Sequence, residues 1–148
     1  MTDARTGLPL TTKYCLTLET VKAIAAAAHA VATDNEWKVS IAIVDDGANL
    51  LYLERLDGAQ IASAEVAQGK ARTAMRYKRP SRALEEAVAG GRTALVAVGG
   101  ITPLQGAVPL VYDGNIIGAI GVSGVLPSQD EQVAAAGASV LSAMTLQR

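Results

Sequence analysis

The chain has 148 residues, of which half are hydrophobic, whereas only 3% are aromatic and none is phenylalanine. This length suits one domain with an aliphatic, alanine-rich core that is stable without a metal or disulfide. Thirteen basic residues nearly balance fourteen acidic ones, so the overall charge gives no attraction to nucleic acid or to an anionic membrane surface.

The chain has one cysteine, and its first residues lack the long apolar stretch of a secretory signal. No apolar run in the sequence has the length needed to cross a bilayer. We therefore expect a cytoplasmic protein with no membrane and no nucleic acid as partner, provided that no leader has been removed. Residues 1–15 are polar and rich in turn formers, so we expect a tail there and a single domain over residues 16–148.

The first predicted helix begins after Thr17, a favourable N-cap residue, and runs to about Asn35. At helical spacing six residues form its core face: Val21, Ile24, Ala25, Ala28, Val31 and Ala32. Its opposite face carries four alanines: Ala23, Ala26, Ala27 and Ala30. Small residues allow another helix to approach closely, so this face predicts contact with a second subunit. The alternative is that alanine simply has a high helix propensity.

His29 is the only histidine of the chain and lies at the edge of this core face. An imidazole there could ligate a metal or a haem iron, or act as an acid or base. The positions one turn away are Ala25 and Thr33, so the helix itself offers no second ligand. A packing or solvent-edge histidine is the alternative.

Two strands are expected over residues 39–44 and 50–55, and then a helix from about Ala62 to Tyr77. Lys70 lies near the core side of that helix, where a lysine is costly unless it reaches solvent or meets an anion. Lys70 is therefore the candidate for an anion contact, such as a ligand carboxylate, with snorkelling to solvent as the alternative. The basic cluster from Lys70 to Arg82 contains one aromatic residue and two glutamates follow it, which argues against a nucleic-acid surface.

A short helix that Ser81 can cap and that reaches Ala89 comes next, followed by a strand over residues 94–98. The loop after this strand is rich in glycine, so Gly99 and Gly100 are free to turn backbone N–H groups toward a ligand. The loop lacks the Lys-Ser/Thr signature of a phosphate-binding P-loop. We interpret it as a ligand-facing loop beside the last hairpin.

The last hairpin turns at Asp113-Gly114, and its second strand contains several glycines. Glycine weakens a strand, so a ligand or another backbone is expected to lie against it. We expect Gly121 to line a binding site, with direct packing of a helix as the alternative. Ser128 and Glu131 have capping-box spacing at the start of the final helix.

The predicted order is helix, two strands, two helices, three strands and helix, typical of an α+β domain with a five-stranded antiparallel sheet flanked by helices. Three segments also resemble the GlcG/HbpS family, which includes the C-terminal domain of PduO: V-S-I-A-I-V-D-D-G-A-N-L-L-Y-L-E-R-L-D-G-A, K-A-R-T-A and G-N-I-I-G-A-I-G-V-S-G. The resemblance extends from Leu16 to Leu141. It implies a profilin-like or PAS-like sheet and a homo-oligomer between dimer and octamer.

Two functional hypotheses follow. Some members of the family bind haem or a related tetrapyrrole through a histidine, which implies an oligomeric ligand-binding protein with His29 as the haem iron ligand and Gly99, Gly100 and Gly121 around the cofactor. Other members are associated with catabolism. The alternative is therefore a small hydrolase, isomerase or tautomerase acting on an acidic aromatic ring-cleavage product. Lys70 would then hold the substrate carboxylate, and amides near the three glycines would stabilise an oxyanion.

Overall fold

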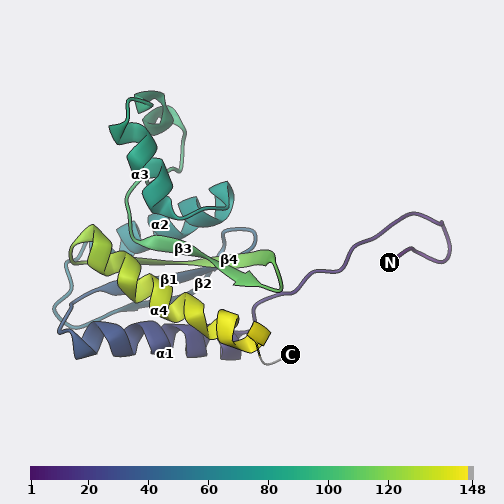
Figure 1. The fold of residues 1–148 in the computed structure, drawn as a ribbon, viewed down its shortest axis with the longest axis horizontal. Helices are drawn as coiled ribbons and strands as arrows, with labels where there is room; N and C mark the ends of the chain where they lie inside the picture. The colour runs from purple at the N-terminus through teal and green to yellow at the C-terminus, as the bar shows by residue number, and fades with distance from the viewer. Residues whose placement is uncertain (147–148) are drawn as a thin grey trace.

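The computed structural model describes residues 1–146 and contains five helices and four strands in that range (Figure 1). In chain order the elements are α1 (Leu18–Asp34), β1 (Ser40–Asp45), β2 (Leu50–Arg55), α2 (Ser63–Tyr77), α3 (Ser81–Ala89), η1 (Thr93–Ala97), β3 (Ala107–Tyr112), β4 (Asn115–Ser123) and α4 (Pro127–Leu146). The α+β class is confirmed. The comparison with profilin-like or PAS-like sheets stays a prediction.

The four strands form one antiparallel sheet in the order β2-β1-β4-β3. Helices α1 and α4 cover one face and α2 covers the other, with α3 and η1 projecting beyond it (Figure 1). The larger hydrophobic core lies beneath α1 and α4 and includes Ile41, Ile43 and Ile120. The smaller core, beneath α2, consists mainly of alanines. The thin packing under α2 brings that helix close to the sheet.

The prediction of a fifth strand over residues 94–98 is wrong, because residues 93–97 form the 3-10 helix η1 outside the sheet. The amide of Val98 donates to the carbonyl of Leu95 at 3.1 Å, a bond that closes a turn instead of joining two strands. Val96 is 62% exposed. A short apolar run does not distinguish a strand from other structures by its periodicity.

One of three predicted helix caps is confirmed. The hydroxyl of Thr17 accepts a hydrogen bond from the amide of Thr20 at the start of α1. Ser81 does not cap α3, because it is the first residue of that helix after Pro80, and its hydroxyl accepts the amide N–H of Ala107 at 3.0 Å. The capping box predicted for α4 is wrong. Helix α4 begins at Pro127, and the amide of Leu126 donates to the side chain of Gln129 at 3.2 Å.

The glycines of β4 are covered by the protein itself. A Cβ atom at Gly121 would overlap the carbonyl oxygen of Ala67 and lie 2.7 Å from the amide nitrogen of Ala71, both in α2. Gly121 therefore lies beneath a helix, and the prediction that it lines an open binding site is wrong. Its lack of a side chain lets the backbone of α2 approach the sheet.

A β-bulge interrupts the pairing of β3 with β4 between Leu110 and Val111. The extra residue reverses the alternation of side chains along β4. Ile116 consequently packs toward α2, and Ile117 joins the core beneath α1 and α4.

The N-terminal segment leaves the body of the molecule, and its far end lies well away from the sheet (Figure 1). It is attached near Lys13, whose ammonium is 2.6 Å from the carboxylate of Asp46, and at Tyr14, whose ring meets Tyr112 edge-on at 4.8 Å. Whether residues 1–15 act as a tail beside a single domain stays a prediction. Within residues 1–146, none of the helices combines the length and the apolarity needed to cross a bilayer.

Candidate functional site

His29 lies in the C-terminal half of α1, and its side chain faces Glu54 of β2. Its Nδ1 atom is 3.4 Å from Oε1 of Glu54, and the two side chains are 44% and 24% exposed. Glu54 pairs with Ile41 in the sheet, so its side chain projects toward α1, the face that Ile41 also occupies. The same carboxylate oxygen is buried and has no hydrogen-bond partner among the described residues. The carboxylate is therefore placed to orient the imidazole.

The phenol of Tyr52 lies on the same face of β2 as Glu54. Burial, reinforced by the charge and a hydrogen bond of Glu54, raises the pKa of this phenol. A carboxylate in such a setting gains from a nearby N–H donor, because an unpaired buried oxygen is costly. With its proton on Nδ1, His29 would place an N–H group 3.4 Å from this oxygen and would leave Nε2 with a free lone pair.

A cleft of about 420 Å³ opens beside His29. We call it the His29 cleft, and its lining residues are His29, Thr33, Glu36, Trp37, Lys38, Leu56 and Asp57. Trp37, the single tryptophan of the chain, is half-buried there and Lys38 is exposed. The cleft joins the C-terminal end of α1 to the start of β1 and the end of β2. Its volume is in the lower part of the range for small-molecule sites.

The side chains that line the His29 cleft could hold one face of a haem. An accessible imidazole with a free Nε2 could ligate the iron, the indole of Trp37 offers a flat apolar surface, and the ammonium of Lys38 could hold a propionate. Carboxylate partners commonly fix the orientation of metal-ligating histidines. Among residues 1–146 no group of three or more histidine, cysteine, aspartate or glutamate side chains could hold a bare metal ion.

Lys70 meets a carboxylate of its own chain. Its Nζ lies 3.0 Å from Oδ2 of Asp130 and 3.0 Å from the carbonyl oxygen of Val122, and both side chains of the ion pair are almost fully buried. The other oxygen of Asp130 accepts the amide N–H of Val125 at 3.1 Å. Burial raises the pKa of Asp130, against the opposing effects of Lys70 and of the Val125 amide. The anion beside Lys70 is thus Asp130 of the same chain, where a ligand carboxylate was expected from the sequence, and the contacts of Lys70 tie α2 to β4 and α4.

The structure does not gather the predicted site residues. His29 is on the α1 side of the sheet, whereas Lys70 and Gly121 lie between the sheet and α2. Gly99 is exposed with open space where a Cβ would lie, and a Cβ at Gly100 would be 2.9 Å from Nη1 of Arg76. The residues assigned to the alternative enzyme therefore form no shared site among the described residues.

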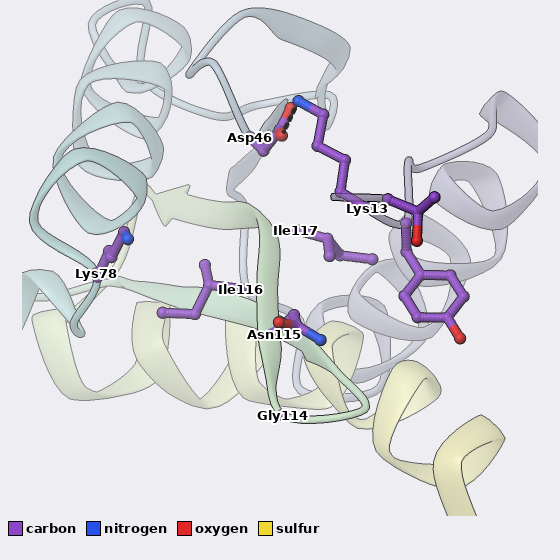
Figure 2. A pocket seen from close by; sticks show the side chains of 9 residues that line it. Lys13, Asp46, Lys78, Gly114, Asn115, Ile116 and Ile117 are labelled. Atoms are coloured by element: carbon purple, nitrogen blue, oxygen red, sulfur yellow. Dashed lines mark hydrogen bonds and ion pairs between the residues drawn. The ribbon is translucent and has the colours of Figure 1, made fainter. Parts of the chain in front are cut away.

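A second cleft, of about 390 Å³, was missed by the sequence analysis (Figure 2). It lies where the two hairpin turns, the end of α2 and the N-terminal segment meet. We call it the hairpin-end cleft, lined by Thr12, Lys13, Tyr14, Asp46, Lys78, Gly114, Asn115, Ile116 and Ile117. Strand β1 separates the two clefts, because Lys38 precedes it and Asp46 follows it. The paired Asp-Gly turns were visible in the sequence, but their convergence depends on the sheet order.

Comparisons with known proteins support the resemblance. The chain is 47% identical to protein GlcG of Escherichia coli K12, over 76% of this chain and 84% of that protein. It is 32% identical to an uncharacterised 15.0 kDa protein from the dhaT-dhaS intergenic region of Citrobacter freundii, over 80% of this chain and 87% of that protein. Both alignments span most of each partner.

Solved structures agree with the sequence matches. The crystal structure of HbpS has a TM-score of 0.84 and 38% identity, covering 94% of this chain and 98% of that chain. The crystal structure of a PduOC–haem complex has a TM-score of 0.78 and 26% identity, covering 86% and 95%. A family model described as "Haem degrading protein HbpS-like" matches residues 16–139. The chain therefore belongs to the GlcG/HbpS family, as the sequence motifs predicted.

Proposed function

We propose that this protein binds haem or a related tetrapyrrole, with His29 as the axial ligand of the iron. The observation that carries this proposal is the pairing of His29 Nδ1 with the buried carboxylate of Glu54 at 3.4 Å, at the edge of the His29 cleft. The match to a haem-degrading family and the likeness to a protein solved with haem support it.

Three side chains each make a different contribution to ligand binding in this proposal. Glu54 fixes the tautomer and the orientation of the imidazole, which favours an iron–nitrogen bond. Trp37 lies against the apolar part of the ring. Lys38 pairs with a propionate, while Glu36 and Asp57 at the same cleft disfavour anionic groups elsewhere along the ring. The cleft thus favours a flat ligand whose negative charge is confined to one edge.

A second copy of the chain completes the site in this proposal. A tetrapyrrole has two broad faces, and a cleft of about 420 Å³ at the surface covers only part of it. Ala26 and Ala30 are exposed on α1 next to His29, so a subunit packed against them would also cover the cleft. We therefore propose a homo-oligomer, between dimer and octamer, in which α1 forms an interface.

A haemin titration tests the ligand role of His29. The wild-type protein should give a saturable Soret band typical of histidine ligation, and His29→Ala should lose that band. Added imidazole should restore it in the variant, because the cavity then accepts the missing ligand. Lys22→Ala, an exposed change on the same helix, serves as the control and should bind like the wild type. Wild-type and His29→Ala spectra that coincide would remove His29 from the site.

Glu54→Gln distinguishes ligation from non-specific haemin adsorption. This change keeps the shape of the side chain but removes the negative charge beside Nδ1. The loss of a second-shell partner of this kind typically weakens a metal site by about 10–100-fold. We expect weaker haemin binding and a higher reduction potential of the iron, since the imidazole becomes a poorer donor. An unchanged affinity and potential would argue against an orienting role for Glu54.

A further inference from the structure

The hairpin-end cleft has a polar wall and an apolar floor. Lys13, Asp46 and Lys78 supply its charged groups, and Ile116 and Ile117 line it from the start of β4 (Figure 2). The lining comes from four segments that are distant in sequence: the N-terminal segment, the β1–β2 turn, the end of α2 and the β3–β4 hairpin. A ligand placed there would contact all four at once.

The charges of this cleft leave one cation without a partner. Lys13 Nζ lies 2.6 Å from Oδ2 of Asp46, so these two groups largely neutralise each other. None of the ion pairs formed within residues 1–146 includes Lys78. The cleft therefore has a net positive charge that a ligand anion could neutralise.

The backbone holds Lys78 in a conformation that its residue type disfavours. Lys78 ends α2 with a φ angle of 54°, in the left-handed region. Its amide N–H is directed at the carbonyls of Ala74 and Met75, which fixes this turn. Glycine is the usual residue at such a helix end because a Cβ atom there is strained. The turn fixes the backbone of Lys78 at the end of α2, where this residue lines the cleft.

We propose that the hairpin-end cleft binds a small amphipathic monocarboxylate, whose carboxylate pairs with Lys78 and whose apolar body lies on Ile116, the isoleucine that points toward Lys78 (Figure 2). The site is distinct from the His29 cleft, since the length of β1 lies between them. A dicarboxylate fits less well, because Asp46 already occupies the second cation, Lys13. A neutral molecule of the same shape would leave Lys78 unpaired.

Benzoate and its neutral counterpart benzamide are the probes. Benzoate should bind the wild-type protein by calorimetry and shift the amide NMR signals of residues 114–117, and its binding should weaken as salt is added. Benzamide should bind at least about tenfold more weakly, because a charge-assisted hydrogen bond is lost. Equal binding of the two probes, or no benzoate binding at all, would overturn the proposal.

Lys78→Gln tests whether Lys78 pairs with the carboxylate of benzoate. Lys22→Gln, at an exposed position of α1, is the matched control. Lys78→Gln should lower the affinity for benzoate at least about tenfold, and Lys22→Gln should leave this affinity unchanged. Equal effects of the two would contradict a specific role for Lys78. His29→Ala should bind benzoate like the wild type, so the haem proposal and this one fail by separate results. A loss of benzoate binding in His29→Ala would count against two independent clefts.

Discussion

Lys70 and Asp130 form an ion pair with a separation of 3.0 Å and side-chain exposures of 4% and 3%. Removing one partner of such a pair leaves a buried, unpaired charge, which typically costs about 3–5 kcal/mol. We therefore expect Lys70→Met to lower the free energy of unfolding by about that amount in urea denaturation. Lys22→Met, at an exposed position, should change it by less than about 0.5 kcal/mol.

A second substitution tests whether the loss of stability in Lys70→Met comes from the unpaired charge of Asp130. In Lys70→Met the carboxylate of Asp130 loses its cation and keeps backbone amides, those of Val125 and Gly124, as hydrogen-bond donors. Adding Asp130→Asn removes the unpaired charge and retains an acceptor for the Val125 amide. The double variant should recover part of the lost stability. A double variant less stable than Lys70→Met would indicate that Asp130 stabilises the protein through contacts other than this ion pair.

Gly121 and Gly99 offer a matched pair of glycine substitutions. A Cβ at Gly121 overlaps the backbone of α2, whereas Gly99 has open space around it. Overpacking of a tight interface typically costs about 1–3 kcal/mol, so Gly121→Ala should lower the melting temperature clearly. Gly99→Ala should leave it nearly unchanged. Similar melting temperatures for the two variants would show that α2 can move away from β4 without loss.

The local features of the fold were predictable from sequence. The start of α1 after Thr17 depends on neighbouring residues and was predicted correctly, whereas α3 has the predicted end at Ala89 but begins one residue early, with Ser81 inside the helix. The apolar run over residues 94–98 was misassigned because a run of this length has no periodicity that distinguishes a strand from the 3-10 helix found there. The bulge that directs the side chain of Ile117 into the core beneath α1 and α4 could not be predicted either, because it depends on the pairing of β4 with β3.

The candidate sites were only partly predictable, because their partners are far apart in the chain. His29 was recognisable as the single imidazole, but Glu54 faces it only after β2 packs near α1. Lys70 was a candidate for contact with a ligand anion, but its partner in the structure is Asp130, which lies 60 residues away in the same chain. Lys78 gave no signal at all, since an exposed lysine in a basic cluster is unremarkable until the cleft around it is known.

The contact of Lys13 with Asp46 predicts a pH-dependent attachment of the N-terminal segment. The hydrogen bond from Lys13 lowers the pKa of Asp46 below its usual value of 3.8. A carboxyl group with a lowered pKa contributes stability above its unfolded pKa and loses it as the pH falls through the folded one. Both groups are partly exposed, so solvent screening keeps the effect small. Carboxyl NMR titration should give a lower pKa for Asp46 in the wild type than in Lys13→Met, and equal values would contradict the contact in solution.

The alanine face of α1 gives a direct test of assembly. Ala23, Ala26 and Ala30 are exposed on a single chain, although their small side chains suit close helix packing. Ala26→Glu would bury an unpaired carboxylate in the proposed interface, so the dissociation constant should rise at least about tenfold, or about 1.4 kcal/mol. Light scattering after size exclusion should show smaller species and unchanged helicity, and haemin binding should weaken with them. Ala135→Glu, at an exposed position of α4, is the control. If both variants keep the wild-type mass, α1 is not the interface, and the His29 cleft must hold its ligand without a second subunit.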